Sequence, residues 1–342
     1  MSPRAWSAPG WAALACVGAL AVAAPAAAEA VRWLPFLLGL LLFSLPHGAV
    51  DHHVPRRLGR AGGPRFVAAY LAVVAVGLVA WALAPLATLA AFLVVAAVHW
   101  GSGDAWYARA VHGRAPFRGR LEAGLFVAAR GALPVALPAL AHPAELARGA
   151  DAILSVVNAG PAPVLSEPVR AAGLVAIAVL VLAAAASGLR GGRSRAARTD
   201  AAELVGLAVF FVATPAILAV GTYLLAWHAP RHVARLIAAD RAQAALTPGR
   251  ALAAWTREAA PLTLVSLAGL GLLAATAWRV PAAAEAVAGA ALALIAALTF
   301  PHAAVVAWMD REQRVFAPER PAAGARDATP TARRGRPVRT AA

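Results

Sequence analysis

Long apolar runs, separated only by short basic stretches, dominate this sequence and limit what it can fold into. Of its 342 residues, 61% are hydrophobic and only 14% are charged. The apolar residues form continuous runs instead of the spaced stripes of a soluble helix. A helix needs about 20 mostly apolar residues to cross a hydrocarbon core about 30 Å thick, and several runs reach that length. The sequence therefore predicts an all-α, polytopic integral membrane helix bundle.

The apolar runs predict about eight or nine transmembrane helices in a single helical domain over residues 1–310. The first run allows two interpretations, because residues 1–30 fit either a cleaved signal peptide or a first helix, of which we favour the helix. Residues 311–342 are rich in Pro, Arg, Ala and Thr and are predicted to form a disordered basic tail. The expected spans lie near residues 11–28, 32–50, 66–84, 86–103, 121–141, 168–188, 202–228, 259–278 and 282–309.

The net charge of +15 comes from arginines in the loops and the tail. Basic loops of this kind indicate a cytoplasmic side and contact with anionic lipid, so we expect membrane lipid and not nucleic acid as the partner. The pattern favours a multi-pass protein of the inner (plasma) membrane. The only cysteine, Cys16, excludes an internal disulfide and a CxxC metal site.

The basic loops create a conflict in topology. The loops at 109–120 and 190–198 and the arginines at 231–250 all favour the cytoplasm. A single helix over 202–228 cannot return the chain to the same side. Either this run, which contains Pro215, is broken or re-entrant, or one basic loop faces the other way.

Histidines cluster at the ends of four apolar runs. Of the nine histidines, only His112 and His142 lie outside these clusters, in loop sequence. Imidazoles at membrane depth are costly and mark functional sites by default, although a single one usually bonds only to a neighbouring helix. Four segments that each bring histidine beside glycine or proline favour a metal site. The clustered histidines are His47, His52, His53, His99, His228, His232 and His302.

Local spacing gives these histidines candidate partners. His228 and His232 are four residues apart, which places both imidazoles on one helical face. Pro230 either kinks that helix or lies in the first turn of a restarted one. Asp51 follows His47 by four residues and Asp104 follows His99 by five, so each could accept the second imidazole N–H and fix the ligating tautomer, or could lie at headgroup level. Imidazole ligands without cysteine allow iron, copper or zinc.

At these residues the sequence resembles the bacterial beta-carotene 15,15'-dioxygenase (Brp/Blh) family, over roughly Leu37 to Asp310. The similarity rests on four strings in the same order, with Ala129 to Pro134 between the second and third. These strings are Pro-His-Gly-Ala-x-Asp at Pro46 to Asp51, His-x-Gly-x-x-Asp at His99 to Asp104, His-x-x-x-His at His228 to His232 with Arg231 inside it, and Pro301-His302.

The resemblance implies a membrane enzyme that splits the central double bond of beta-carotene with O2 into two molecules of retinal. It implies Fe(2+) held by four histidines, which here are His47, His99, His228 and His232. His302 would be an alternative ligand or would lie behind the ligands together with Asp51, Asp104 and His52. The product would pass to a retinal-binding rhodopsin.

The aromatic residues Phe43, Tyr223 and Trp227 are candidates for an apolar substrate tunnel, whereas Trp100 and Trp106 fit an interfacial belt. A di-iron hydroxylase is disfavoured because only one HxxxH is present. A carrier with an intramembrane His/Asp relay, or an accessory protein without oxygenase activity, remains the alternative function.

Overall fold

The computed structural model describes residues 7–155, 157, 159–190, 192, 194–277 and 283–317. Over these residues the chain is helical and contains no strand, which confirms the all-α prediction. The elements are α1 Ser7–Ala23, α2 Pro25–Ala30, α3 Leu34–Gly39, η2 Leu40–Ser44, α4 Leu45–Ala49, η3 Asp51–His53, α5 Val54–Arg57, α6 Pro64–Leu83, α7 Pro85–Ala110, α8 Arg120–Ala141, α9 Pro143–Ser155, α10 Glu167–Arg190, α11 Arg195–Ala213, α12 Ala216–Tyr223, η4 Leu224–His228, α13 Ala229–Ala239, α14 Arg241–Ala244, α15 Pro248–Ala277 and α16 Ala283–Glu312.

In the part of the chain that the structure describes, six helical segments are long and apolar enough to cross a membrane, as an integral membrane protein requires. Their outward faces are apolar, with Val76 of α6 68% exposed, Val94 of α7 64% and Val175 of α10 63%. A water-soluble protein seldom exposes so large an apolar surface. The predicted count of eight or nine is not confirmed. The six segments are Leu34–Arg57, Pro64–Leu83, Pro85–Ala110, Arg120–Ala141, Glu167–Arg190 and Gly289–Glu312.

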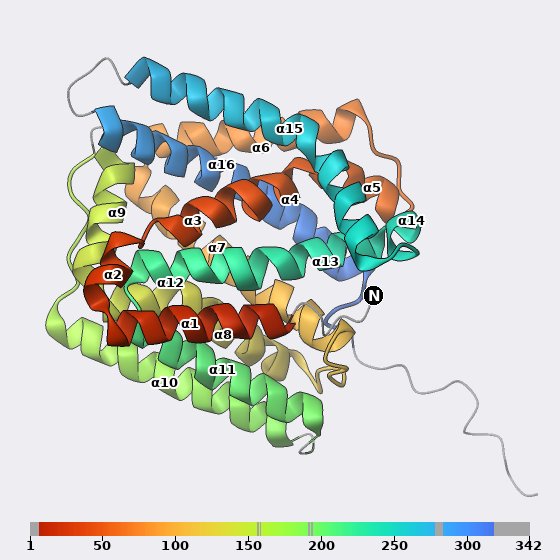
Figure 1. Ribbon diagram of the computed structural model, residues 1–342, viewed down its shortest axis with the longest axis horizontal. Coiled ribbons are helices and arrows are strands. Elements are labelled where there is room, and N and C mark those ends of the chain that lie inside the picture. The colour runs from red at the N-terminus through yellow and green to blue at the C-terminus, as the bar shows by residue number, and fades with distance from the viewer. Residues whose placement is uncertain are drawn as a thin grey trace, which may run out of the picture.

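The long helices lie roughly side by side, with α10 and α11 at one edge of the bundle and α6 and α15 at the other (Figure 1). The apolar run at 202–228 is broken, as one of the two topology solutions required. α11 ends at Ala213, and α12 begins after Pro215, which has no N–H to donate and whose ring would clash with the carbonyl four residues earlier in a continuous helix. α12, η4 and α13 then form a nearly continuous rod through the middle of the bundle (Figure 1).

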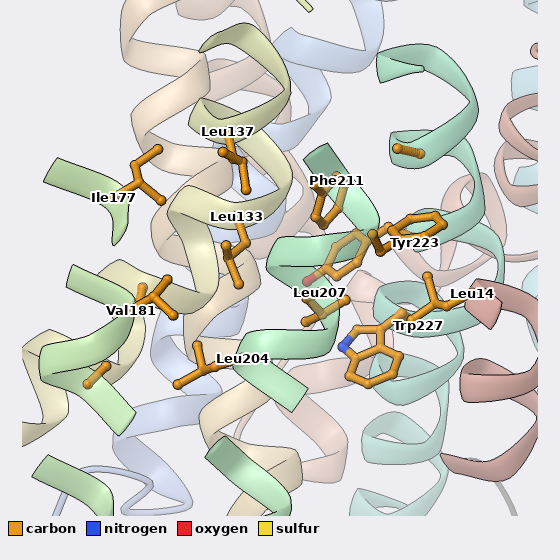
Figure 2. Close-up of a cluster of buried hydrophobic side chains, with 14 of the residues drawn as sticks. Leu14, Leu133, Leu137, Ile177, Val181, Leu204, Leu207, Phe211, Tyr223 and Trp227 are labelled. Atoms are coloured by element: carbon orange, nitrogen blue, oxygen red, sulfur yellow. The ribbon is translucent and has the colours of Figure 1, made fainter. Parts of the chain in front are cut away.

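The largest apolar core packs this rod against its neighbours. Leu14 of α1, Leu133 of α8, Leu207 of α11 and Trp227 of η4 meet in it, and Figure 2 shows their side chains pointing toward one another. Trp11 of α1 adds an edge-to-face contact to Trp227, with ring centroids 5.2 Å apart. This core fixes the segment that ends in His228.

Two π-helical turns lie immediately before histidines. η2 precedes α4, which carries His47, and η4 ends in His228 itself. A π-turn inserts an extra residue into a helix and is common at functional sites. The two π-turns contact each other. They can do so because Gly39 packs directly against the backbone of Leu225, where a β-carbon would lie 3.0 Å from the Leu225 nitrogen.

The helical domain extends slightly beyond residue 310. α16 continues to Glu312, and the turn after it buries Val315, which is 3% exposed. Gln313 accepts a hydrogen bond from Nε of Arg235 at 2.9 Å. The predicted disordered tail otherwise falls on residues 318–342, which lie outside the described residues.

Candidate metal centre

Five histidines from separate parts of the chain meet in the interior of the bundle. None is more than 6% exposed. α4, α7, η4, α13 and α16 each supply one of them, and because η4 runs directly into α13, the group joins four separate parts of the chain. These histidines are His47, His99, His228, His232 and His302.

The spacing of the rings fits a common ion. Ring centroids lie 4.8 Å apart for His47 and His302, 5.0 Å for His99 and His228, and 6.4 Å for His228 and His232. A ring whose nitrogen binds an ion at about 2.1 Å has its centroid about 3.2 Å from it, so ligand rings around one ion are about 4.5 Å apart at right angles and about 6.4 Å apart when opposite. The observed range therefore matches imidazoles arranged around a single metal.

Several ring nitrogens of these histidines lack a hydrogen-bond partner among the described residues. Nδ1 of His47 and His99, Nε2 of His228 and His302, and both ring nitrogens of His232 are buried without one. Buried polar atoms are normally satisfied, and each exception needs an explanation. Neighbouring buried imidazoles with unpaired nitrogens have the donor atoms that a metal ion binds.

His302 is held by a carboxylate. Its Nδ1 lies 2.8 Å from Oδ2 of Asp51, and the hydroxyl of Tyr70 donates to the same oxygen at 3.1 Å. An imidazole that donates its Nδ1–H to a carboxylate keeps the lone pair of its Nε2. This is the usual way in which a carboxylate orients a metal-binding histidine. The partner of Asp51 is therefore His302, instead of the neighbouring His47 that its spacing suggested.

The structure likewise corrects the expected role of Asp104, which bonds to no histidine. Its Oδ1 accepts from Arg231 at 2.9 Å, and its Oδ2 accepts from Arg130 at 3.1 Å and from the indole of Trp227 at 3.3 Å. Glu203 completes the network, because each arginine donates a hydrogen bond to one of its carboxylate oxygens at 2.7 Å. Two buried guanidinium groups attract this carboxylate more strongly than a neutral imidazole can.

The network joins α7 and α13, which carry histidines of this group, to α8 and α11. Asp104 belongs to α7, Arg130 to α8, Glu203 to α11 and Arg231 to α13. Arg231 lies between His228 and His232 in sequence. Sequence reasoning missed Glu203, although a carboxylate inside the apolar run at 202–228 was a detectable signal of a buried partner.

The rings of His228 and His232 lie near each other, with centroids 6.4 Å apart. Pro230 lies in the first turn of α13, which is the second of the two arrangements considered for it. The two rings are nearly parallel, at 14°. His52 lies apart, since its contacts in the described chain are a hydrogen bond to the Ala49 carbonyl at 2.9 Å and stacking on His53 at 3.8 Å.

The tunnel candidates occupy different surroundings. Tyr223 and Trp227 are fully buried in the largest apolar core, and the Tyr223 ring stacks on His228 with centroids 6.2 Å apart. Phe43 packs against a separate core around Val233. Trp100, expected in an interfacial belt, lies 5.5 Å from His228 between ring centroids.

A second group could hold a metal by distance alone. Ligand atoms of His112, Asp200 and Glu203 all lie within 4.8 Å of one another. Guanidinium groups already neutralise its carboxylates, with Arg114 2.8 Å from Asp200 and Arg130 2.7 Å from Glu203. A cation added there would be repelled by these arginines, which makes this group a poor site for a cation.

Comparison with known proteins agrees with this geometry. The family model described as beta-carotene 15,15'-dioxygenase matches residues 38–310. A probable beta-carotene 15,15'-dioxygenase Blh of Halobacterium salinarum is 35% identical over 322 residues, covering 90% of this chain and 92% of the relative. A probable beta-carotene 15,15'-dioxygenase Brp of the same species is 29% identical over 312 residues, covering 82% and 84%. No solved structure matches the chain.

Proposed function

The chain belongs to the beta-carotene 15,15'-dioxygenase family, and from this premise we propose that it is a membrane-embedded, iron-dependent enzyme. The proposed reaction cleaves the central 15,15' double bond of beta-carotene with O2 and gives two molecules of retinal. The observation that carries the proposal is the convergence of five buried histidines with unpartnered nitrogens in a bundle of apolar helices.

The proposed ligands of Fe(2+) are His47, His99, His228 and His232. His302 is proposed as a fifth imidazole at the same site, because its free Nε2 is buried and its ring is 4.8 Å from both His47 and His99. Bound iron would supply the reactivity toward O2 that amino-acid side chains lack. Neutral imidazoles suit this position because they bring no negative charge into the bilayer.

The protein contributes position and water exclusion. Asp51 holds His302 in one tautomer, and the network of Asp104, Arg130, Glu203 and Arg231 fixes the helices that carry His99, His228 and His232. The surrounding apolar cores keep water from the centre, which protects reactive species formed during oxygenation.

The apolar substrate partitions into lipid, so a multi-pass location in the plasma membrane is proposed, with O2 and beta-carotene taken from the bilayer. A retinal-binding rhodopsin in the same membrane is proposed to receive the product. A single helical domain that ends with the turn around buried Val315 is proposed to form the catalytic unit.

Expression in bacteria that accumulate beta-carotene tests the proposal. We expect the orange colour to fade while retinal appears in pigment extracts, and we expect His228→Ala or His232→Ala to prevent both. Unchanged carotene in cells that contain folded, iron-loaded protein would overturn the proposed substrate.

A further inference from the structure

A lipid-facing pocket lies between α7 and α16, beside the histidine centre. Its volume is about 340 Å³, within the range of about 300–1,000 Å³ typical of small-molecule sites. α7 contributes residues from Val94 to Ser102, and α16 contributes residues from Phe300 to Asp310. None of the residues assigned above to a substrate tunnel lines it.

The pocket reaches the proposed metal centre. His99 forms part of its wall, and Phe300 and Ala303 flank Pro301 and His302 on the opposite helix. A molecule in the pocket is therefore in contact with one proposed ligand and adjacent to a second.

The opposite side of the pocket opens outward, toward the hydrocarbon. Val94 is 64% exposed and Val98 is 54% exposed, and Ala304 and Ala307 on α16 are also exposed. Both helices are candidate membrane spans, so these side chains face lipid tails. An apolar molecule can enter from the bilayer without crossing water.

The residues that line the pocket favour a hydrocarbon ligand. Apart from His99 and Ser102, its polar group is Asp310, and the carboxylate of Asp310 is already paired with Arg235 at 2.8 Å. The alanines and valines leave room for a flat chain, and they offer a ligand van der Waals contact without hydrogen bonds. A polar head group would lose its hydration here without compensation.

We propose that this α7–α16 pocket binds one arm of a linear polyene, which enters sideways from the bilayer and so brings its central bond to the histidine centre. This inference rests on the proposed function, because the substrate class comes from it. The proposal assigns this pocket one arm of the polyene, because its lining comes from α7 and α16 and includes one of the proposed ligands, His99.

Filling the mouth of the pocket tests the inference. Val94→Trp and Ala307→Trp each change an exposed side chain. Val94 lies five residues before His99 and Ala307 lies five residues after His302, so folding and iron binding should survive. Ala178→Trp is the matched control, because Ala178 is an exposed residue of α10, at the far edge of the bundle (Figure 1). Iron content and the melting temperature of each variant verify that the centre is intact.

Beta-carotene binding is measured without oxygen by the change in its visible absorption when it is added to protein in lipid nanodiscs. We expect both pocket variants to bind at least tenfold more weakly than the unmodified protein and to show a correspondingly raised KM, whereas Ala178→Trp stays within twofold. Wild-type affinity and KM in both pocket variants would overturn the inference.

The two proposals can fail separately. Pocket-dependent binding without retinal formation in oxygen would support this inference and overturn the proposed reaction. Retinal formation that is insensitive to Val94→Trp and Ala307→Trp would support the proposed reaction and overturn the inference about the pocket. Absence of both binding and cleavage in the unmodified protein would overturn both.

Discussion

Nδ1 of His302 lies 2.8 Å from Oδ2 of Asp51, a carboxylate 251 residues earlier in the chain. This contact joins α16 to the short helical segment that follows His47. It brings the last histidine of the sequence into contact with the first cluster and leaves Nε2 of His302 free to bind a metal.

Asp51→Asn tests whether this contact orients a ligand. An amide keeps the shape of the carboxylate but loses its charge and can present a donor to His302, so the ligating tautomer is no longer enforced. Loss of such a partner typically costs about 10–100-fold in metal affinity or activity. Competition with an iron chelator measures the affinity. Tyr70→Phe, which removes only the second donor to Asp51, should have a smaller effect, and equal affinity in Asp51→Asn and the unmodified protein would refute the assignment.

The location of the metal can be tested by comparing two histidine groups. We expect His228→Ala and His232→Ala to lose bound iron, because each removes a ligand, while His112→Ala retains it. Elemental analysis of the purified proteins gives the iron content, and circular dichroism verifies the helical fold. Iron lost only in His112→Ala would move the site to the group of His112, Asp200 and Glu203.

Glu203→Gln tests the buried charge network. The substitution leaves the buried guanidinium groups of Arg130 and Arg231 with one carboxylate fewer, and breaking a buried pair typically costs about 3–5 kcal/mol. We expect a marked fall in the melting temperature in detergent. The control is Glu167→Gln, which breaks an ion pair with Arg170 at an exposed carboxylate and should change little. Equal melting temperatures for the two variants would contradict the structural role of the network.

The close crossing of α7 and α8 provides a steric test. A β-carbon at Gly131 would overlap the carbonyl of Ala97, whereas one at Gly124 of the same helix meets nothing within 4 Å. Gly131→Ala should therefore separate the two helices, displace His99 and lower both the melting temperature and the iron affinity. Gly124→Ala should be neutral or slightly stabilising, because alanine is the better helix former. Similar behaviour of the two variants would show that the crossing is not tight.

Much of the architecture follows from local sequence. Apolar run length predicts helices at membrane depth, and histidines at run ends predict the segments that meet at the centre. The break after α11 was one of two ways to place all the basic loops on the cytoplasmic side or explain why one is not there. Pro215 is its local cause. The π-turns before His47 and His228 could not be predicted, because they arise where two helices pack at Gly39 and Gly221.

The hydrogen-bond partners of the buried aspartates were the least predictable feature of the site. Spacing within one helix suggested that Asp51 and Asp104 would serve the histidines next to them. Asp51 instead bonds to His302, and Asp104 bonds to Arg130 and Arg231, because tertiary contacts place stronger or better-aligned donors there. Sequence spacing does not record which helices become neighbours.

The most direct test of the account is the product balance of the purified, iron-reconstituted protein supplied with beta-carotene in detergent micelles and oxygen. Chromatography quantifies the carotene consumed and every aldehyde formed. The account predicts two retinal molecules for each beta-carotene lost, with no turnover after iron is chelated and recovery when it is restored. Longer apocarotenals, or carotene that remains intact with the iron site filled, would contradict it.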